Sequence, residues 1–173
     1  MDIATLTQAL WPNGNGPECP QVYALLDGAR NDALAPAIWL SNLPYTCLYA
    51  GTLSRSLSLA APYLVQLAPE SRFFHMLVHR GCGNAWGIFV VAKPDVTLKV
   101  LRKHFRTLLR VQDEQGRILA FRFYDPRVLR VYVPTCGPSE TLQIFGPVDA
   151  LACESALSDE LLEFRKLRHT AYS

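Results

Sequence analysis

Two runs of almost continuous apolar residues, Val22–Leu26 and Trp86–Val91, mark the chain. A run in which apolar and polar positions do not alternate is typical of a strand buried on both faces. Such strands belong to sheets that helices cover. Further strands are predicted over Tyr45–Tyr49 and Pro62–Leu67.

Segments with apolar residues at helical spacing lie between these strands. The longest begins after Asp95 or Thr97 and ends near Leu108, with an apolar stripe toward the core and basic residues toward water. Shorter helices are predicted over residues 2–11, 31–39, 52–60 and 71–79.

Residues 109–134 predict a hairpin that continues into a helix. Leu109–Gln112 and Arg117–Tyr124 flank a four-residue turn that ends in glycine. In an extended segment, Leu119, Phe121 and Phe123 share an apolar face, which predicts a strand central to the sheet. The opposite face carries Ile118, Ala120, Arg122 and Tyr124.

Asp125 and Pro126 predict the start of the helix that follows this strand. An aspartate accepts hydrogen bonds from the free N–H groups of a first helical turn, and proline is tolerated at the first helical position. Pro134 ends the helix, since the residue before a proline is disfavoured in the α region.

The chain changes character after Pro134. Residues 135–140 form a loop rich in glycine, proline and serine, residues 141–153 predict one or two short strands, and residues 158–172 predict a final helix. We expect an α/β fold with a mixed sheet flanked by helices and a short C-terminal helical appendage. The predicted division is an α/β domain over residues 1–134 and a short extension over residues 135–173.

Composition narrows the class of protein. Half of the 173 residues are hydrophobic and 18% are charged, below the usual roughly 25%. This balance allows a core together with some apolar surface for a partner. The net charge of +2 is too small to argue for nucleic acid.

The sequence also bears on location. The N-terminus lacks the pattern of a secretory signal, and no apolar run reaches the roughly 20 residues of a membrane span, so we expect a cytoplasmic protein without membrane contact. Five separated cysteines without a CxxC pair are expected to be buried or free thiols: Cys19, Cys47, Cys82, Cys136 and Cys153.

Two aspartates are the most enzyme-like feature. Asp27 and Asp125 each follow a predicted strand, and a pair of carboxylates can serve as acid and base or hold a divalent metal. Capping explains Asp125 without catalysis, and Asp27 can be a turn residue or a partner of Arg30. We favour these structural roles.

A second pattern, His75, His79 and Cys82, has a spacing that zinc could use, because histidines four apart share a helix face. It lacks the glutamate of HExxH, so exposed histidines near a loop cysteine are the favoured interpretation. We expect no metal and no cofactor.

Arginines offer the best candidates for partner contact. Arg122 either pairs with a carboxylate such as Asp27 or faces a partner, and Arg127 and Arg130 lie on one side of the following helix. With Tyr124 they have the composition of an interface hot spot. Internal ion pairs that join strand to helix are an equally good interpretation. The basic helix Lys99–Arg110 is interpreted as a solvated face rather than a nucleic-acid site.

Four segments carry a resemblance to a known family. The string FRFYDPRVLRVYVP (residues 121–134) resembles the signature of adaptor chaperones of bacterial type VI secretion, the Tap/Tec type, first catalogued as a domain of unknown function. Similar matches are YALLDGAR (23–30), APYLVQL (61–67) and WGIFV (86–90), the last followed by LRKHFRTLL (101–109). The resemblance covers roughly residues 20–134. It makes Asp27, Phe121, Phe123, Asp125 and Pro126 signature positions.

The resemblance implies a role. Such adaptors bind a toxic effector in the cytoplasm and deliver it to the spike protein of the secretion apparatus, without catalytic activity. Many relatives continue into a larger helical lobe, whereas this chain has only residues 135–173 there. Alternatives are a small α/β hydrolase or metal-dependent enzyme that uses Asp27 and Asp125, and an immunity protein that neutralises a toxin.

Overall fold

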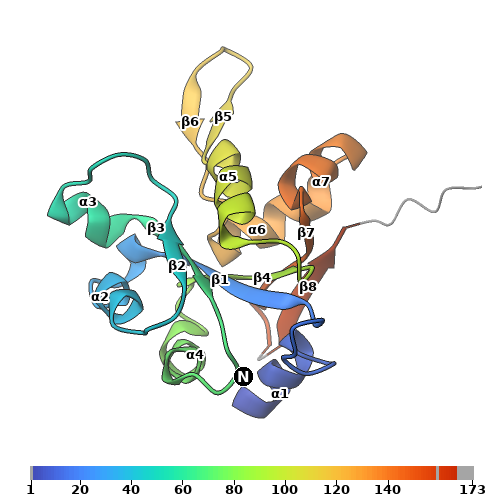
Figure 1. Cartoon of the computed structure of the whole chain (residues 1–173). Coiled ribbons are helices and arrows are strands. Elements are labelled where there is room, and N and C mark those ends of the chain that lie inside the picture. Colours follow the sequence, from blue (N-terminus) through green and yellow to red (C-terminus); the bar gives the residue numbers. More distant parts are fainter. Residues whose placement is uncertain (1, 159, 167–173) are drawn as a thin grey trace, which may run out of the picture.

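A six-stranded sheet forms the centre of the molecule in the computed structural model, which describes residues 2–158 and 160–166 (Figure 1). The strand order is β2-β3-β1-β4-β7-β8, and every pairing in this sheet is antiparallel. The strands are β1 (Gln21–Asp27), β2 (Tyr45–Cys47), β3 (Pro62–Gln66), β4 (Gly87–Ala92), β7 (Val148–Glu154) and β8 (Leu161–Arg165). The predicted α/β class with flanking helices is confirmed, but the prediction of a mixed sheet is wrong, since no parallel pair occurs among the described strands.

Helices cover both faces of the sheet. They are α1 (Ile3–Leu10), α2 (Leu34–Trp39), α3 (Arg55–Ala60), α4 (Arg72–Met76), α5 (Leu98–Leu108), α6 (Pro126–Tyr132) and α7 (Pro138–Phe145). Single turns of 3-10 helix cover Gly28–Arg30 and Val133–Thr135, and a π-helical turn, Leu77–Gly81, extends α4. Asp2, Thr97 and Asp125 cap α1, α5 and α6 with their side chains.

Strand β1 contributes to two separate hydrophobic clusters, as its unbroken apolar sequence predicts. Val22, Ala24 and Leu26 face the cluster built with α1, α2 and α4. Tyr23 and Leu25 face the second cluster, which α5, α6 and α7 complete. Figure 1 shows these two sets of helices on opposite sides of the sheet. Asp27 follows Tyr23 and Leu25 in the alternation, which directs it toward the second cluster.

The predicted central strand over residues 119–125 is wrong. The hairpin itself exists, but β5 (Arg110–Gln112) and β6 (Ile118–Ala120) pair only with each other and form a separate sheet that projects from the body (Figure 1). Ile118 is 69% exposed. The chain leaves the hairpin after Ala120 and turns into the core, which buries Phe123 and Tyr124 in the second cluster.

The predicted C-terminal helix is also wrong where the structure describes it. Residues 161–165 are β8, paired with β7 along its length, and residues 167–172 lie outside the described residues. Residues 141–145, predicted as strand, belong to α7. The apolar residues Leu161, Leu162 and Phe164 are compatible with either a strand or a helix. Hydrogen bonding to β7 makes the segment a strand. Residues after Pro134 thus add two strands to the main sheet; independent folding of residues 1–134 stays a prediction.

Candidate functional site

An ion pair connects the two signature segments that lie furthest apart in the chain. The guanidinium of Arg122 donates to Oδ2 of Asp27, at the end of β1. The other carboxylate oxygen of Asp27 accepts a hydrogen bond from the N–H of Ala29 at 3.1 Å. Asp27 is completely buried, whereas the side chain of Arg122 is 47% exposed. Of the two alternatives for Arg122, the structure shows the internal pair, with part of the side chain still accessible.

Asp125 has the capping role that the sequence predicts. Its Oδ1 accepts from the N–H of Arg127 at 2.9 Å, and its Oδ2 accepts from the guanidinium of the same residue at 2.6 Å. Burial alone would raise the pKa of Asp125, but the hydrogen bonds from Arg127 outweigh burial and lower it. Pro126 stands at the first helical position, as predicted.

The aromatic residues of the signature build the core rather than an exposed face. Phe123 is fully buried and stacks on Phe105 of α5, with ring centroids 5.6 Å apart. Phe121 is partly buried against Tyr132. Tyr124 is only 4% exposed, and burial raises its pKa. The ring of Tyr124 belongs to the second cluster and little of it is exposed, so its contact with a partner stays a prediction.

Arg130 joins helix α6 to the end of strand β7. Its guanidinium donates to the carbonyl oxygen of Glu154 at 2.7 Å. The carboxylate of Glu154 in turn accepts from the N–H groups of Gly83 and Ala85, at 2.5 and 3.0 Å. Arg130, like Arg122 and Arg127, therefore has an internal role beside any contact with a partner.

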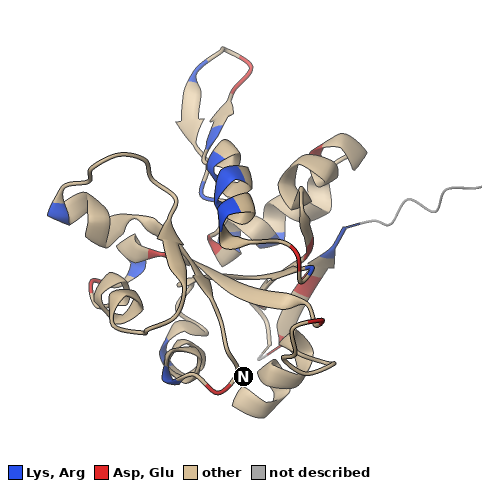
Figure 2. Cartoon of the chain, viewed as in Figure 1, with Lys and Arg blue, Asp and Glu red and all other residues tan. Residues whose placement is uncertain are grey.

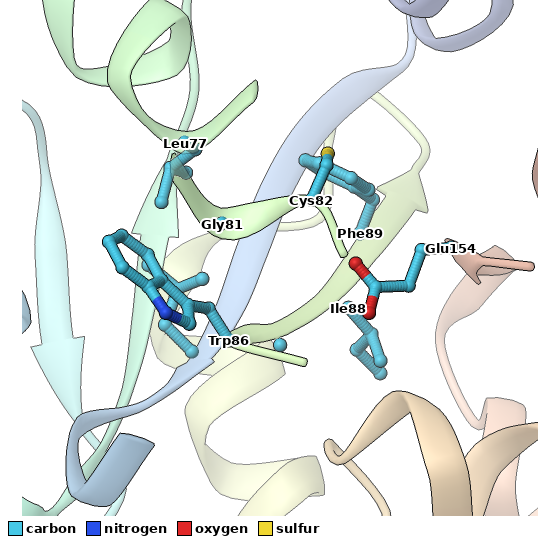
Figure 3. Close-up of a pocket in the computed structure, with 9 residues that line it drawn as sticks. Leu77, Gly81, Cys82, Trp86, Ile88, Phe89 and Glu154 are labelled. Carbon is cyan, nitrogen blue, oxygen red and sulfur yellow. The ribbon is translucent and has the colours of Figure 1, made fainter. Parts of the chain in front are cut away.

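Glu154 also lies at the edge of a small apolar cavity between α4 and the sheet (Figure 3). Leu77, Trp86 and Phe89 are among its apolar lining residues, and Cys82 also lines it. Burial raises the pKa of the Cys82 thiol to about 11. A thiol with so high a pKa is protonated at neutral pH and is a poor nucleophile.

Two open hollows flank the signature residues. The first, called here the arginine hollow, has a volume of about 800 Å³ and includes Arg30, Arg127 and Arg130 in its lining. The second, called here the groove, has a volume of about 840 Å³ and lies between the hairpin with the end of α5 and the segment from Leu48 to Ala60. Arg122 and Tyr124 line the groove. The predicted arginines are thus divided between two surfaces.

The two enzyme-like patterns were the aspartates Asp27 and Asp125 and the group His75, His79 and Cys82. Asp27 and Asp125 are both buried, and each accepts hydrogen bonds from a backbone N–H and from an arginine. Residues 2–158 and 160–166 contain no group of three or more histidine, cysteine, aspartate or glutamate side chains able to hold a metal. All five cysteines are free thiols, as predicted.

Sequence reasoning missed the groove and the contacts of Glu154. The groove joins residues 48–60 to residues 106–124, and no local pattern reports that proximity. Ile118 and Leu119 of the hairpin are exposed, but the sequence does not distinguish an exposed apolar residue from a buried one. Glu154 gave no signal, because its partners are backbone N–H groups.

The fold and these contacts define an α/β domain whose signature residues are held by internal ion pairs beside two open hollows. A family model described as "Domain of unknown function (DUF4123)" matches residues 22–143, which is more than half of the chain. The chain therefore belongs to the DUF4123 family. No curated protein and no solved structure matches it. Within the described residues, the helices are too short or too polar for a membrane span.

Proposed function

We propose that this protein is a non-enzymatic adaptor chaperone in the bacterial cytoplasm, which binds a toxic effector of type VI secretion and helps to load it onto the spike protein. The observation that carries the proposal is the family match over residues 22–143. It spans the four segments that resemble the adaptor chaperones, including the string FRFYDPR.

The geometry supports a binding role. Acid–base catalysis needs carboxylates within hydrogen-bond reach of a substrate, whereas Asp27 and Asp125 are both buried and paired with arginines. The groove and the arginine hollow instead present arginines and apolar side chains at the surface. Arginine is enriched among the residues that dominate binding energy in protein interfaces.

The proposal is tested by co-expression of the tagged chain with the effector and the spike protein encoded beside its gene. We expect both to co-purify with the chain, and we expect deletion of the chain to abolish delivery of the effector. Absence of both partners from the purified material, with delivery unchanged by the deletion, would refute the adaptor role. Binding of a toxin with loss of its toxicity, and no effect on delivery, would favour an immunity protein.

A further inference from the structure

The groove has walls from three parts of the chain. Helix α5 and the hairpin contribute Arg106, Leu109, Arg110, Ala120 and Phe121 on one side. On the other side, the β2–α3 connection and α3 contribute Tyr49, Leu53, Leu57 and Ala60. Figure 1 shows α3 and its connection across from the projecting hairpin. The volume of about 840 Å³ lies within the roughly 300–1,000 Å³ of pockets that enclose a drug-sized ligand, so several side chains of one segment fit.

The charge of the groove is entirely positive among the described residues. Arg106, Arg110 and Arg122 line it, and its lining includes no aspartate or glutamate. Arg122 is paired with Asp27, but in the described part of the chain neither Arg106 nor Arg110 forms an ion pair. Figure 2 shows that the basic residues of α5 lie along one side of the helix. Two arginines at the rim are therefore available to carboxylates of another molecule.

The groove also exposes apolar surface. Leu57 is 44% exposed, and Leu53, Leu109 and Phe121 are partly buried beside it. In the hairpin, Arg110 lies opposite Ala120, so Ile118, two residues before Ala120, lies on the same face as these groove residues. Apolar side chains gathered at a hollow and rimmed by charge are characteristic of an interaction site.

We propose that the groove binds an acidic amphipathic segment of a partner protein, whose apolar side chains contact the leucines and Phe121 and whose carboxylates pair with Arg106 and Arg110. This inference rests on the proposed function, since the partner is the effector or the spike protein. An amphipathic helix in an apolar groove is a recurrent mode of peptide recognition. The leucines favour such a segment over a nucleic-acid strand, whose phosphates would leave them uncovered.

Matched variants distinguish a loss of binding caused by changes in the groove from one caused by a change in the protein's total charge. Arg106→Glu/Arg110→Glu reverses the two rim charges, and Arg72→Glu/Arg80→Glu makes the same change at exposed positions of α4 and the turn that follows it, on the opposite side of the sheet. Leu57→Ala removes apolar surface from the groove, with Leu142→Ala as its control, a 52% exposed leucine of α7. Circular dichroism and thermal unfolding establish that each variant is folded.

Two measurements use these variants. The first is co-purification of the effector and the spike protein with each variant. The second is fluorescence anisotropy with a labelled peptide of about 16 residues, roughly four helical turns, with leucine along one face and glutamate elsewhere. A peptide with lysine in place of glutamate, a shuffled peptide and a single-stranded oligonucleotide serve as comparison probes.

We expect the acidic amphipathic peptide to bind, with affinity reduced roughly tenfold or more by Arg106→Glu/Arg110→Glu and severalfold by Leu57→Ala. The control variants should stay within about twofold of the wild type, and co-purification should follow the same order. If the partners co-purify equally with the groove and control variants, the groove inference fails and the adaptor role stands. If no partner co-purifies but the peptide results hold, the adaptor role fails, whereas the groove's preference for an acidic amphipathic segment stands for a partner other than the effector and the spike protein. Absence of peptide binding, or stronger binding of the oligonucleotide with the same loss on charge reversal, overturns the inference.

Discussion

Arg122 donates a hydrogen bond to Asp27, a residue 95 positions earlier at the end of the central strand β1. The pair joins the segment between the hairpin and α6 to the end of β1, and it puts a fully buried carboxylate beneath a guanidinium that still reaches the surface of the groove. The same ion pair therefore holds two distant segments of the fold together and positions the Arg122 side chain at the groove.

Loss of the Arg122 guanidinium should destabilise the protein. Arg122→Met keeps most of the side-chain length but leaves the buried Asp27 with only its backbone partner. We expect the free energy of unfolding to fall by ~2 kcal/mol, below the usual 3–5 kcal/mol for a broken buried pair because Arg122 is half exposed. Urea unfolding measures the change. Arg117→Met, which breaks the surface pair with Asp113, is the control and should cost less than ~1 kcal/mol. Equal stability of both variants would contradict a structural role for the Arg122–Asp27 pair.

Gly28 follows Asp27 at a position where the backbone of residues 59–61 comes too close to leave room for a Cβ atom. A Cβ atom at this position would lie 2.6 Å from the carbonyl oxygen of Ala61 and would also contact that of Leu59. We expect Gly28→Ala to lower the free energy of unfolding by ~1–3 kcal/mol, because the backbone of residues 59–61 at the end of α3 would have to move. Gly16→Ala, where the nearest atom would be the Cys19 sulfur at 3.7 Å, is the control for chemical denaturation. A Gly28→Ala variant as stable as Gly16→Ala would show that the backbone of residues 59–61 can move at little cost in free energy.

His104 should make stability depend on pH below neutrality. Burial lowers the pKa of His104 below its usual 6.5, a hydrogen bond with the Ile144 carbonyl raises it, and the charge of Lys166 lowers it. The net shift is downward, so the unfolded chain binds the proton more readily than the folded protein. Stability is therefore complete above about pH 6.5 and is lost as the pH falls toward the folded pKa. The free energy of unfolding, measured by urea from pH 7.5 to 5, should fall less steeply in His104→Asn. The same slope in His104→Asn and in the wild type would contradict the prediction.

The sequence predicts what local chemistry determines and misses what depends on distant contacts. Asp125 and Pro126 were predictable because a cap and its helix are neighbours in the chain. Strand β1 was predictable because burial on both faces leaves an unbroken apolar run. The pairing of Arg122 with Asp27 could be stated only as one option, since no local pattern determines how two segments 95 residues apart meet.

The errors have a common origin. Alternation along residues 118–124 indicates an extended chain but not which strand lies beside it, so a projecting hairpin was taken for a central strand. Residues 161–165 became strand because β7 offers an edge for pairing, and tertiary contact overrides a weak helical pattern. The groove depends on both features that local patterns leave open, the position of the hairpin and the approach of residues 48–60.

Cys153 should be the least reactive of the five thiols. It is completely buried in β7, and burial raises the pKa of its thiol to about 12. Because the thiolate is the reactive form, alkylation at pH 8 requires opening of the sheet. A pulse of iodoacetamide followed by peptide mass spectrometry should label Cys19, which is partly exposed, well before Cys153. Equal labelling rates in the native protein, with prompt labelling of both in urea, would contradict the burial of Cys153.

Glu154 should hold the loop between the π-helical turn and β4. Gly83 and Ala85 both have positive φ values, 84° and 53°, and both donate their N–H groups to the Glu154 carboxylate. The backbone of Ala85 is strained because a residue other than glycine rarely adopts a positive φ. The loop conformation therefore depends on the contacts that hold it. We expect Glu154→Ala to lower the free energy of unfolding by ~1–3 kcal/mol and to accelerate hydrogen exchange at these two amides. Glu163→Ala, which removes a surface carboxylate paired with Arg165, is the control and should change neither quantity appreciably. Unchanged exchange at Gly83 and Ala85 in Glu154→Ala would mean that the backbone holds the loop without the carboxylate.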